Sequence, residues 1–130
     1  MPVAEIGDTS TVEKEITEDV IADFAEVSEA FNPVHTDPEY AEETMFGGRI
    51  AHGMISGALI SAALADLDGD IIYLSQDLQF QDPVFPGDTV TATVEVEDID
   101  DDDRLHVDTT ATVDDNAVVS GKAVVLSMEH

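Results

Sequence analysis

The spacing of apolar residues changes along the chain, and each change predicts a structural element. Residues 10–17 alternate apolar and polar positions, which predicts a short strand. Residues 17–29 place apolar positions at helical spacing, with Thr17 as a potential N-cap and acids in the first turn. This helix should end before the Asn32-Pro33 step, because a residue that precedes proline is forced towards extended geometry.

A second, shorter helix is predicted from Pro38 to about residue 44. Asp37 precedes it as a potential N-cap, and proline suits the first helical position. Residues 53–66 form a further segment that is apolar on nearly every side and rich in small side chains. Such a helix is expected to be buried in a core, and it falls short of the roughly 20 apolar residues that span a bilayer.

The second half of the chain returns to a period of two and predicts four strands. Their ranges are 71–82, 89–98, 104–114 and 117–128. We expect an antiparallel meander, which the early strand completes as a further member of the sheet. A sheet wrapped around one long apolar helix is an α+β arrangement of the hot-dog type, and residues 1–130 suffice for a single such domain. Its open edges favour the pairing of two copies into a homodimer.

The charge of the chain is extreme. Thirty acidic residues against four basic ones give a formal net charge of −26 and a pI near 4.1. The acids are interleaved with periodic apolar residues, which favours a folded domain over a disordered acidic tail. Such a domain repels itself in dilute buffer, whereas the Debye length shrinks to about 3 Å at 1 M salt. We therefore predict a protein from the cytosol of a salt-loving organism.

The composition excludes several classes of function. The chain has no cysteine, so a disulfide framework, a thiolate metal site and a cysteine nucleophile are ruled out. Nucleic acid is not an expected partner, because phosphate contacts need basic residues and the chain has only Lys14, Arg49, Arg104 and Lys122. Neither a signal peptide nor a membrane partner is indicated, so we expect a cytoplasmic protein.

One short stretch concentrates residues that can perform chemistry. Residues 28–41, SEAFNPVHTDPEYA, contain an Asn-Pro step, His35 and a capped helix start. The sequence FGGRIAHGM follows and places His52 and Gly53 at the start of the apolar helix. Taken alone, His35 fits an ordinary hydrogen-bonded loop histidine. In this order and on these elements, however, the residues resemble the MaoC-like (R)-specific enoyl-CoA hydratases.

The resemblance implies both a fold and a reaction. It covers roughly residues 10–128, including the segment YLSQDLQFQDPVFPGDTVTATVEV, and implies a hot-dog domain that usually forms dimers. In this family an Asp and a His hold one water and add it to a trans-2-enoyl-CoA, which gives the (R)-3-hydroxyacyl-CoA. No metal or redox cofactor is implied, because coenzyme A is part of the substrate. The implied pathway is fatty-acid oxidation or precursor supply for polyhydroxyalkanoate, and the sequence does not choose between them.

The resemblance also implies roles for single residues. The family's His falls on His35, its Asp falls on Ala30, and its oxyanion donor falls on the backbone N–H of Gly53. A histidine suits water activation near neutral pH. A glycine N–H at a helix N-terminus offers a free donor at the positive end of the helix dipole. Asn32 fits two roles equally well, since its amide would orient the loop or form an Asx turn.

Four further residues are candidates for contact with the substrate. Ser61, two turns after Gly53, would line an acyl pocket with Leu64, although plain helix packing explains Ser61 equally well. Arg49 would reach a phosphate of coenzyme A or pair with surface acids. His52 is a further candidate, although a structural hydrogen bond near the helix start is the stronger expectation.

The alanine at position 30 leaves three interpretations open. Ala30 is an engineered change that disarms the enzyme, a natural substitution in a fold kept for binding, or a loss for which another acid compensates. The adjacent Glu29 is a poor substitute, because neighbouring side chains point in different directions. The other motif residues are all present, which favours an engineered Asp-to-Ala variant. We predict strongly reduced hydratase activity.

Two other functions remain as alternatives. Ala30 is compatible with a non-catalytic protein that binds acyl-CoA. A hot-dog acyl-CoA thioesterase would usually place a catalytic acid in or near the central helix, where Asp66 is the one candidate.

Overall fold

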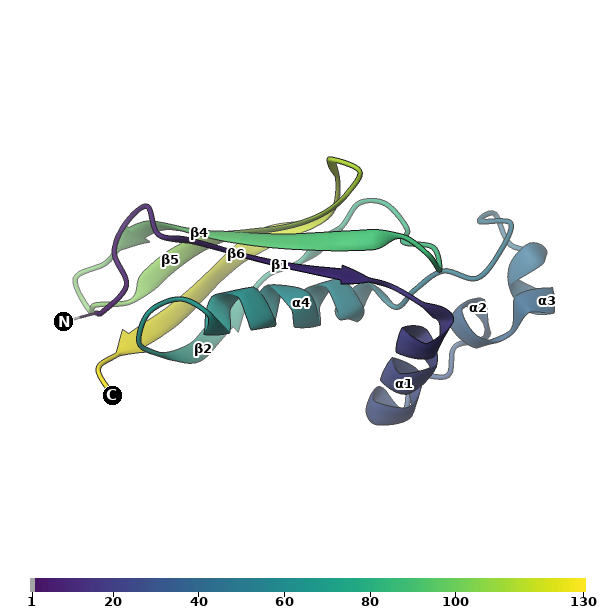
Figure 1. Ribbon diagram of the computed structural model, residues 1–130, viewed down its shortest axis with the longest axis horizontal. Helices are drawn as coiled ribbons and strands as arrows, with labels where there is room; N and C mark the ends of the chain where they lie inside the picture. Colours follow the sequence, from purple (N-terminus) through teal and green to yellow (C-terminus); the bar gives the residue numbers. More distant parts are fainter. Residues whose placement is uncertain (1) are drawn as a thin grey trace.

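The computed structural model describes residues 2–130, in which one antiparallel sheet wraps around helix α4 (Figure 1). The predicted α+β hot-dog arrangement is confirmed. The strands are β1 (Thr9–Glu15), β2 (Asp70–Gln76), β3 (Gln79–Phe80), β4 (Thr89–Ile99), β5 (Leu105–Val113) and β6 (Asn116–Met128). The helices are α1 (Glu18–Ser28), α2 (Pro33–Thr36), α3 (Pro38–Glu42) and α4 (Gly53–Ala65).

The alternation along β4 determines which face of the sheet is buried. Val90, Ala92, Val94 and Val96 are fully buried, and the positions between them are two threonines and a glutamate that reach solvent. The buried side chains face α4, which lies across this side of the sheet (Figure 1). Burial of each valine stabilises the fold by roughly 1.5–3 kcal/mol.

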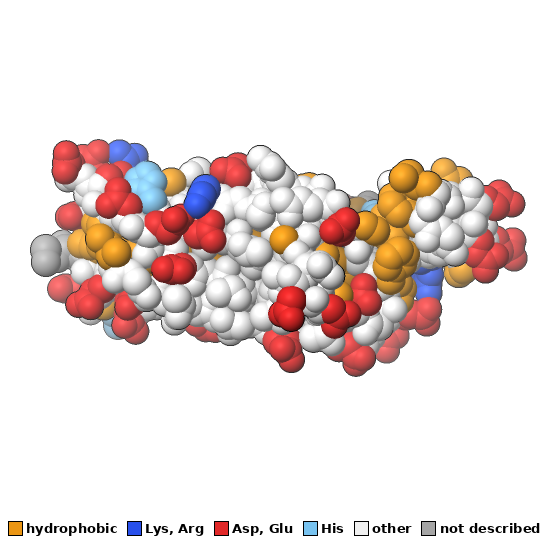
Figure 2. Space-filling view, turned by 90° about the horizontal axis from the view of Figure 1, so that it is seen from above, with side chains coloured by type: hydrophobic (Ala, Val, Ile, Leu, Met, Phe, Trp, Pro, Cys, Tyr) orange, Lys and Arg blue, Asp and Glu red, His pale blue; other side chains and the backbone are white. Residues whose placement is uncertain are grey.

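The outer face of the sheet is polar and acidic, as Figure 2 shows. Lys122 on β6 donates to Glu97 over 2.6 Å and to Asp108 over 2.9 Å, so carboxylates of β4 and β5 engage this cation. Such exposed pairs contribute little to stability. Within residues 2–130, no helix has the length and apolar character needed to cross a membrane.

Helix α4 is buried along one side only. Ile60, Ala63 and Leu64 are at most 1% exposed and face the sheet, whereas Met54 is 53% exposed and Ala58 is also open to solvent. The prediction of a helix buried all round is therefore wrong for one side. The sheet wraps only part of the helix circumference, so the other apolar side stays uncovered by residues 2–130.

The predicted four-stranded meander is correct for β4, β5 and β6 and wrong for β2. Strand β2 pairs with β6 at the edge of the sheet, so the order is β1-β4-β5-β6-β2. The predicted strand over residues 71–82 is also interrupted between β2 and β3. There the carbonyl oxygen of Asp77 approaches β6 so closely that a Cβ on Gly121 would lie 1.9 Å away. Only glycine allows this approach.

The predicted helix caps are confirmed. The Thr17 hydroxyl accepts from the Val20 N–H over 3.1 Å at the start of α1, and Asp37 accepts from two N–H groups of α3. Helix α1 ends before the Asn-Pro step, with Glu29 in the left-handed region at φ 60°. Helix α3 ends at Glu42, two residues before the predicted end. The short helix α2 was not predicted, because its four residues show no apolar period.

Candidate active site

The motif residues meet at the N-terminal end of α4. Figure 1 shows α1, α2 and α3 grouped beyond this end of the sheet. Hydrogen bonds join the segment around α2 to the segment that enters α4: the Ile50 N–H, for example, donates to the Val34 carbonyl oxygen over 3.2 Å. The loop motif and the His-Gly-Met motif, which are separate in sequence, therefore form one site.

His35 lies on α2 with one ring nitrogen fixed and the other available. Its Nδ1 lies 2.8 Å from the carbonyl oxygen of Ile50. A carbonyl oxygen only accepts, so Nδ1 carries the hydrogen and Nε2 carries a lone pair in the neutral ring. The ring lines a hollow of about 450 Å³, together with Gly53, Phe80 and Val84. His35 can therefore act as a base towards a molecule in this hollow.

The surroundings of His35 favour its neutral form. Burial lowers the pKa of the imidazole below its ordinary value of 6.5. The hydrogen bond to the Ile50 carbonyl opposes this shift, and the neighbouring His52 adds to it. A lowered pKa keeps the lone pair on Nε2 available for proton abstraction at neutral pH.

His52 is buried behind His35. The two rings lie 4.1 Å apart between centroids, at an interplanar angle of 32°. The Nε2 of His52 donates to the carbonyl oxygen of Ala30 over 2.8 Å, and the residue is 6% exposed. The expected structural hydrogen bond is thus confirmed. His52 does not line the hollow beside His35, so the prediction that it contacts substrate is not supported by its position.

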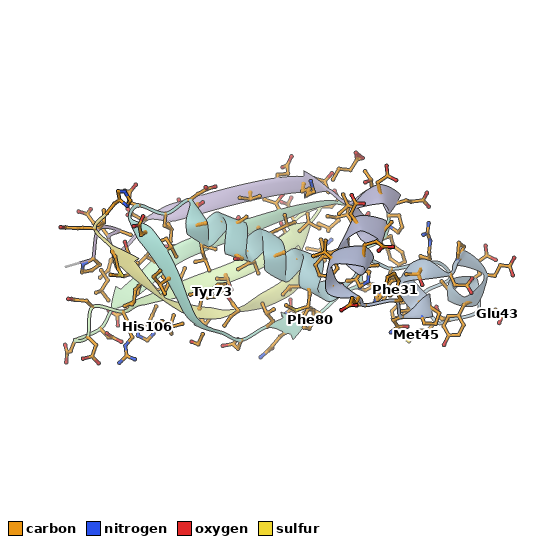
Figure 3. The ribbon with its side chains drawn as sticks, turned by 90° about the horizontal axis from the view of Figure 1, so that it is seen from below. Phe31, Glu43, Met45, Tyr73, Phe80 and His106 are labelled. Atoms are coloured by element: carbon orange, nitrogen blue, oxygen red, sulfur yellow. The ribbon has the colours of Figure 1, made fainter. Side chains whose placement is uncertain are left out.

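Gly53 is the first residue of α4 and lines the same hollow as His35. Its N–H belongs to the first turn, where no intrahelical carbonyl is available as an acceptor. A Cβ at this position would lie 2.6 Å from two ring carbons of Phe80. A side chain at position 53 would therefore displace the aromatic ring of Phe80, which Figure 3 labels beside the start of α4. This close packing was not anticipated from the sequence.

The structure distinguishes the two roles expected for Asn32. Its Oδ1 accepts from the Val34 N–H over 3.2 Å, which is an Asx turn that caps α2. Ala30, two residues earlier, is partly buried, and its carbonyl oxygen is the acceptor for His52. Glu29 is exposed and does not line the hollow beside His35, in agreement with the expectation that it is a poor substitute for the motif acid.

A second hollow of about 470 Å³ runs along the exposed side of α4. Ser61 lines it with Gly57, Ala58 and Tyr73, and Met54 lines both hollows. The prediction that Leu64 lines the same pocket is wrong. Leu64 is 1% exposed in the core, because its position on the helix turns it towards the sheet.

The remaining charged candidates lie outside the two hollows. Arg49 donates to the carboxylate of Glu18 on α1, which is the surface pairing that was one of its two expected roles. Asp66 is the exposed C-cap of α4, at the end opposite Gly53. Within residues 2–130, no group of three or more His, Cys, Asp or Glu side chains is arranged to hold a metal ion.

The sequence pattern did not reveal the roles of Ile50 and Phe80. Ile50 acts through its backbone carbonyl, which has no side-chain signature. Phe80 follows the interruption between β2 and β3, and its contact with Gly53 depends on tertiary packing. The one sequence feature that could have indicated Phe80 is that an aromatic residue precedes a proline-rich bend.

Known proteins share the sequence and the structure of this chain. Residues 4–117 match the family described as MaoC like domain. The (R)-specific enoyl-CoA hydratase of Aeromonas caviae is 42% identical over 125 residues, which cover 93% of each chain. The 3-hydroxybutyryl-CoA dehydratase of Methylorubrum extorquens is 40% identical over 124 residues, which cover 93% of this chain and 79% of that protein.

Solved structures agree with the sequence matches. The unliganded R-hydratase PhaJ1 from Pseudomonas aeruginosa superposes with a TM-score of 0.90 and 38% identity, over 99% of this chain and 88% of that chain. The (R)-hydratase from A. caviae involved in PHA biosynthesis gives a TM-score of 0.90 and 37% identity, over 96% of this chain and 98% of that chain. On this evidence of motif, fold and sequence, the chain belongs to the MaoC-like domain family.

Proposed function

We propose that this chain is an (R)-specific enoyl-CoA hydratase, which adds water reversibly to a trans-2-enoyl-CoA to give the (R)-3-hydroxyacyl-CoA. The observation that carries the proposal is the shared hollow of His35 and Gly53. It brings a basic nitrogen and a backbone donor to one cavity. Relatives named (R)-specific enoyl-CoA hydratase, at 42% identity, support the same reaction.

The reaction needs a base and a stabilised oxyanion. Water adds its oxygen to C3 of the enoyl group and a proton reaches C2, while negative charge develops on the thioester oxygen. The free Nε2 of His35 takes the proton from the attacking water. The Gly53 N–H, at the positive end of α4, donates to the thioester oxygen and stabilises the developing charge. No metal or redox cofactor takes part in this proposed mechanism.

Position 30 is where the proposed reaction is impaired. A carboxylate there would help His35 to hold the attacking water and take a share of its proton, and the proton that leaves the water is the one that reaches C2. Ala30 has no group that can share this proton. Loss of a group that participates in proton transfer lowers rates by on the order of 10² to 10⁴. We propose that Ala30 reduces hydration by a factor of this size, whether the alanine is natural or engineered.

The hollow beside Ser61 is the proposed site for the acyl chain. Its lining is mainly apolar, and Met54 connects it to the hollow that contains His35. Arg49 is the proposed contact for a phosphate of coenzyme A. Arg49 precedes Ile50 by one residue and His52 by three, and its side chain would exchange its exposed partner Glu18 for the phosphate.

A homodimer is proposed from the uncovered side of the fold. Strand β2 is an edge of the sheet, and its Ile72, Tyr73 and Leu74 are 47%, 39% and 47% exposed. Met54 of α4 and Phe80 of β3 expose further apolar surface. A second copy that pairs with β2 would cover an open edge and this apolar surface together. Light scattering in molar salt measures whether two copies associate.

The cytosol of a salt-loving organism is the proposed location. The net charge of −26 supports it, because molar salt screens the repulsion within such a chain. Coenzyme A is itself an anion, so the same screening would favour substrate binding.

The test is an assay in molar salt of the Ala30→Asp chain with crotonyl-CoA and with butyryl-CoA. A hydratase converts crotonyl-CoA to (R)-3-hydroxybutyryl-CoA and leaves butyryl-CoA intact. Release of free coenzyme A from butyryl-CoA would identify a thioesterase instead. Tight binding of both thioesters with no product would identify a non-catalytic binding protein.

A further inference from the structure

Two imidazoles in contact connect segments that are distant in sequence, and the proposed reaction uses only one of them. His35, on the loop segment, donates from Nδ1 to the carbonyl oxygen of Ile50 over 2.8 Å. His52, on the segment before α4, donates from Nε2 to the carbonyl oxygen of Ala30 over 2.8 Å. Each histidine therefore holds the backbone of the other histidine's segment.

The loop segment needs such support because it contains little regular secondary structure of its own. Helix α2 has four residues, which is too short to be stable alone. The left-handed conformation of Glu29, with φ at 60°, separates it from α1. The two crossed hydrogen bonds and the contact between the rings therefore bind this loop to the start of α4.

The surroundings of His52 indicate that its orientation matters. Its Nδ1 is buried and has no hydrogen-bond partner among residues 2–130. A buried polar atom without a partner costs free energy, and an apolar ring of similar size would avoid this cost. The rings of Phe24, at 5.0 Å, and His35, at 4.1 Å, enclose His52 on the inside of the site. Within the described part of the chain, the Nε2 bond to Ala30 is therefore the one hydrogen bond that orients the ring.

We infer that His52 is a positioning residue that fixes position 30 relative to His35. It holds the main chain at position 30 by its hydrogen bond and supports the imidazole of His35 by contact between the rings. His52 lines neither hollow, so it acts through these two neighbours and not on the substrate. The expected effect on kcat rests on the proposed hydratase function. The expected effect on the titration of His35 does not depend on that function.

Two substitutions separate the two contacts of His52. His52→Phe keeps a ring beside His35 and removes the donor to Ala30. His52→Gln removes the ring and keeps an amide N–H at a comparable distance along the side chain. His106→Gln is the matched control, because His106 is exposed on β5 and bonds to Asp100 over 3.0 Å.

The rate measurement uses these variants in the Ala30→Asp chain. We expect His52→Phe to lower kcat for crotonyl-CoA by on the order of 10², the cost of a displacement of about 1 Å, with little change in KM. His52→Gln should recover part of this loss because it restores the donor. His106→Gln should leave kcat unchanged. A His52→Phe variant with the kcat of its Ala30→Asp parent would overturn the inference.

The second measurement needs no turnover and uses the chain with Ala30 in place. Titration of His35 followed by NMR should show that its pKa rises in His52→Gln, because the covering ring is lost, and stays low in His52→Phe. A pKa of His35 that is the same in His52→Gln and in the parent would also overturn the inference. If Ala30→Asp fails to hydrate any enoyl-CoA, the proposed function fails, and this titration still decides the role of His52. Thermal unfolding of each variant confirms that a folded chain is being compared.

Discussion

Histidines at the two ends of the molecule have opposite surroundings. His106 on β5 bonds to the carboxylate of Asp100 over 3.0 Å, and its side chain is 46% exposed. His35 bonds to a backbone carbonyl instead, packs against a buried second imidazole and lines a hollow. Figure 3 labels His106 at one end of the sheet, and Phe80 and Phe31 towards the other.

The difference shows what turns a histidine into a candidate base. The bond to Asp100 occupies one nitrogen of His106 with a charged partner in solvent, where ion pairs have small effects. A backbone carbonyl fixes the tautomer of His35 without adding charge, and burial keeps its ring neutral. A count of residue types does not distinguish the two histidines. Their hydrogen-bond partners do, because His106 pairs with a surface carboxylate and His35 lies in the candidate site.

The largest effect is expected from removing the base. In the Ala30→Asp chain, His35→Asn should lower kcat for hydration of crotonyl-CoA by on the order of 10² to 10⁴, because the attacking water loses its proton acceptor. His106→Asn, made in the same chain, should keep the full rate. Equal losses in the two variants would remove the distinction between the two histidines.

A smaller loss is expected at the oxyanion donor. Gly53→Ala should lower kcat by on the order of 10², because the added Cβ would lie 2.6 Å from ring carbons of Phe80. The shift that relieves this overlap would disturb the N–H proposed to face the thioester. The control is Gly48→Ala, whose Cβ would meet no atom within 4 Å. Hydration kinetics of both variants measure the contrast. Unchanged kcat in Gly53→Ala would show that the close packing of Phe80 against this position does not matter for the rate.

Salt should change the activity by a smaller factor and in one direction. At a net charge of −26, repulsion within the chain and towards coenzyme A decreases as salt rises to the molar range. The kcat/KM of the Ala30→Asp chain should therefore increase with added KCl. A maximum in dilute buffer would contradict both the proposed environment and this electrostatic reasoning.

The smallest expected effect is a shift in the pH profile. The pKa of His35 lies below its ordinary value of 6.5, so the acidic limb of kcat/KM should have its midpoint below pH 6.5. The stability from the neutral ring is present above pH 6.5 and decreases as the pH falls through the lowered pKa, because the unfolded chain binds the proton more readily there. Activity profiles and urea unfolding at several pH values measure the two effects. A midpoint above pH 6.5 would contradict the assigned surroundings of His35.

Local patterns were sufficient to predict the caps and the helix that positions the site. Thr17 and Asp37 bond as their sequence positions indicate, and α4 begins at Gly53 as predicted. Each of these features depends on residues within one turn of each other. The same is true of the alternation that orients β4.

Features that depend on distant segments were not predictable in the same way. Because α4 is apolar on every side, its sequence could not show which side the sheet covers. For this reason Leu64, which faces the core, was predicted to line the pocket. The position of β2 beyond β6 depends on the packing of the sheet and not on the spacing within β2. The bonds of His35 and His52 end on backbone carbonyls, which every residue possesses.

The central claim is that this chain has a hydratase site that lacks one carboxylate. The most direct test compares the initial rate of crotonyl-CoA hydration between the chain with Ala30 and the Ala30→Asp chain, in molar KCl. We predict a gain on the order of 10² to 10⁴ in kcat, because the carboxylate shares the water with His35. An Ala30→Asp chain that is folded and as inactive as its parent would contradict the claim.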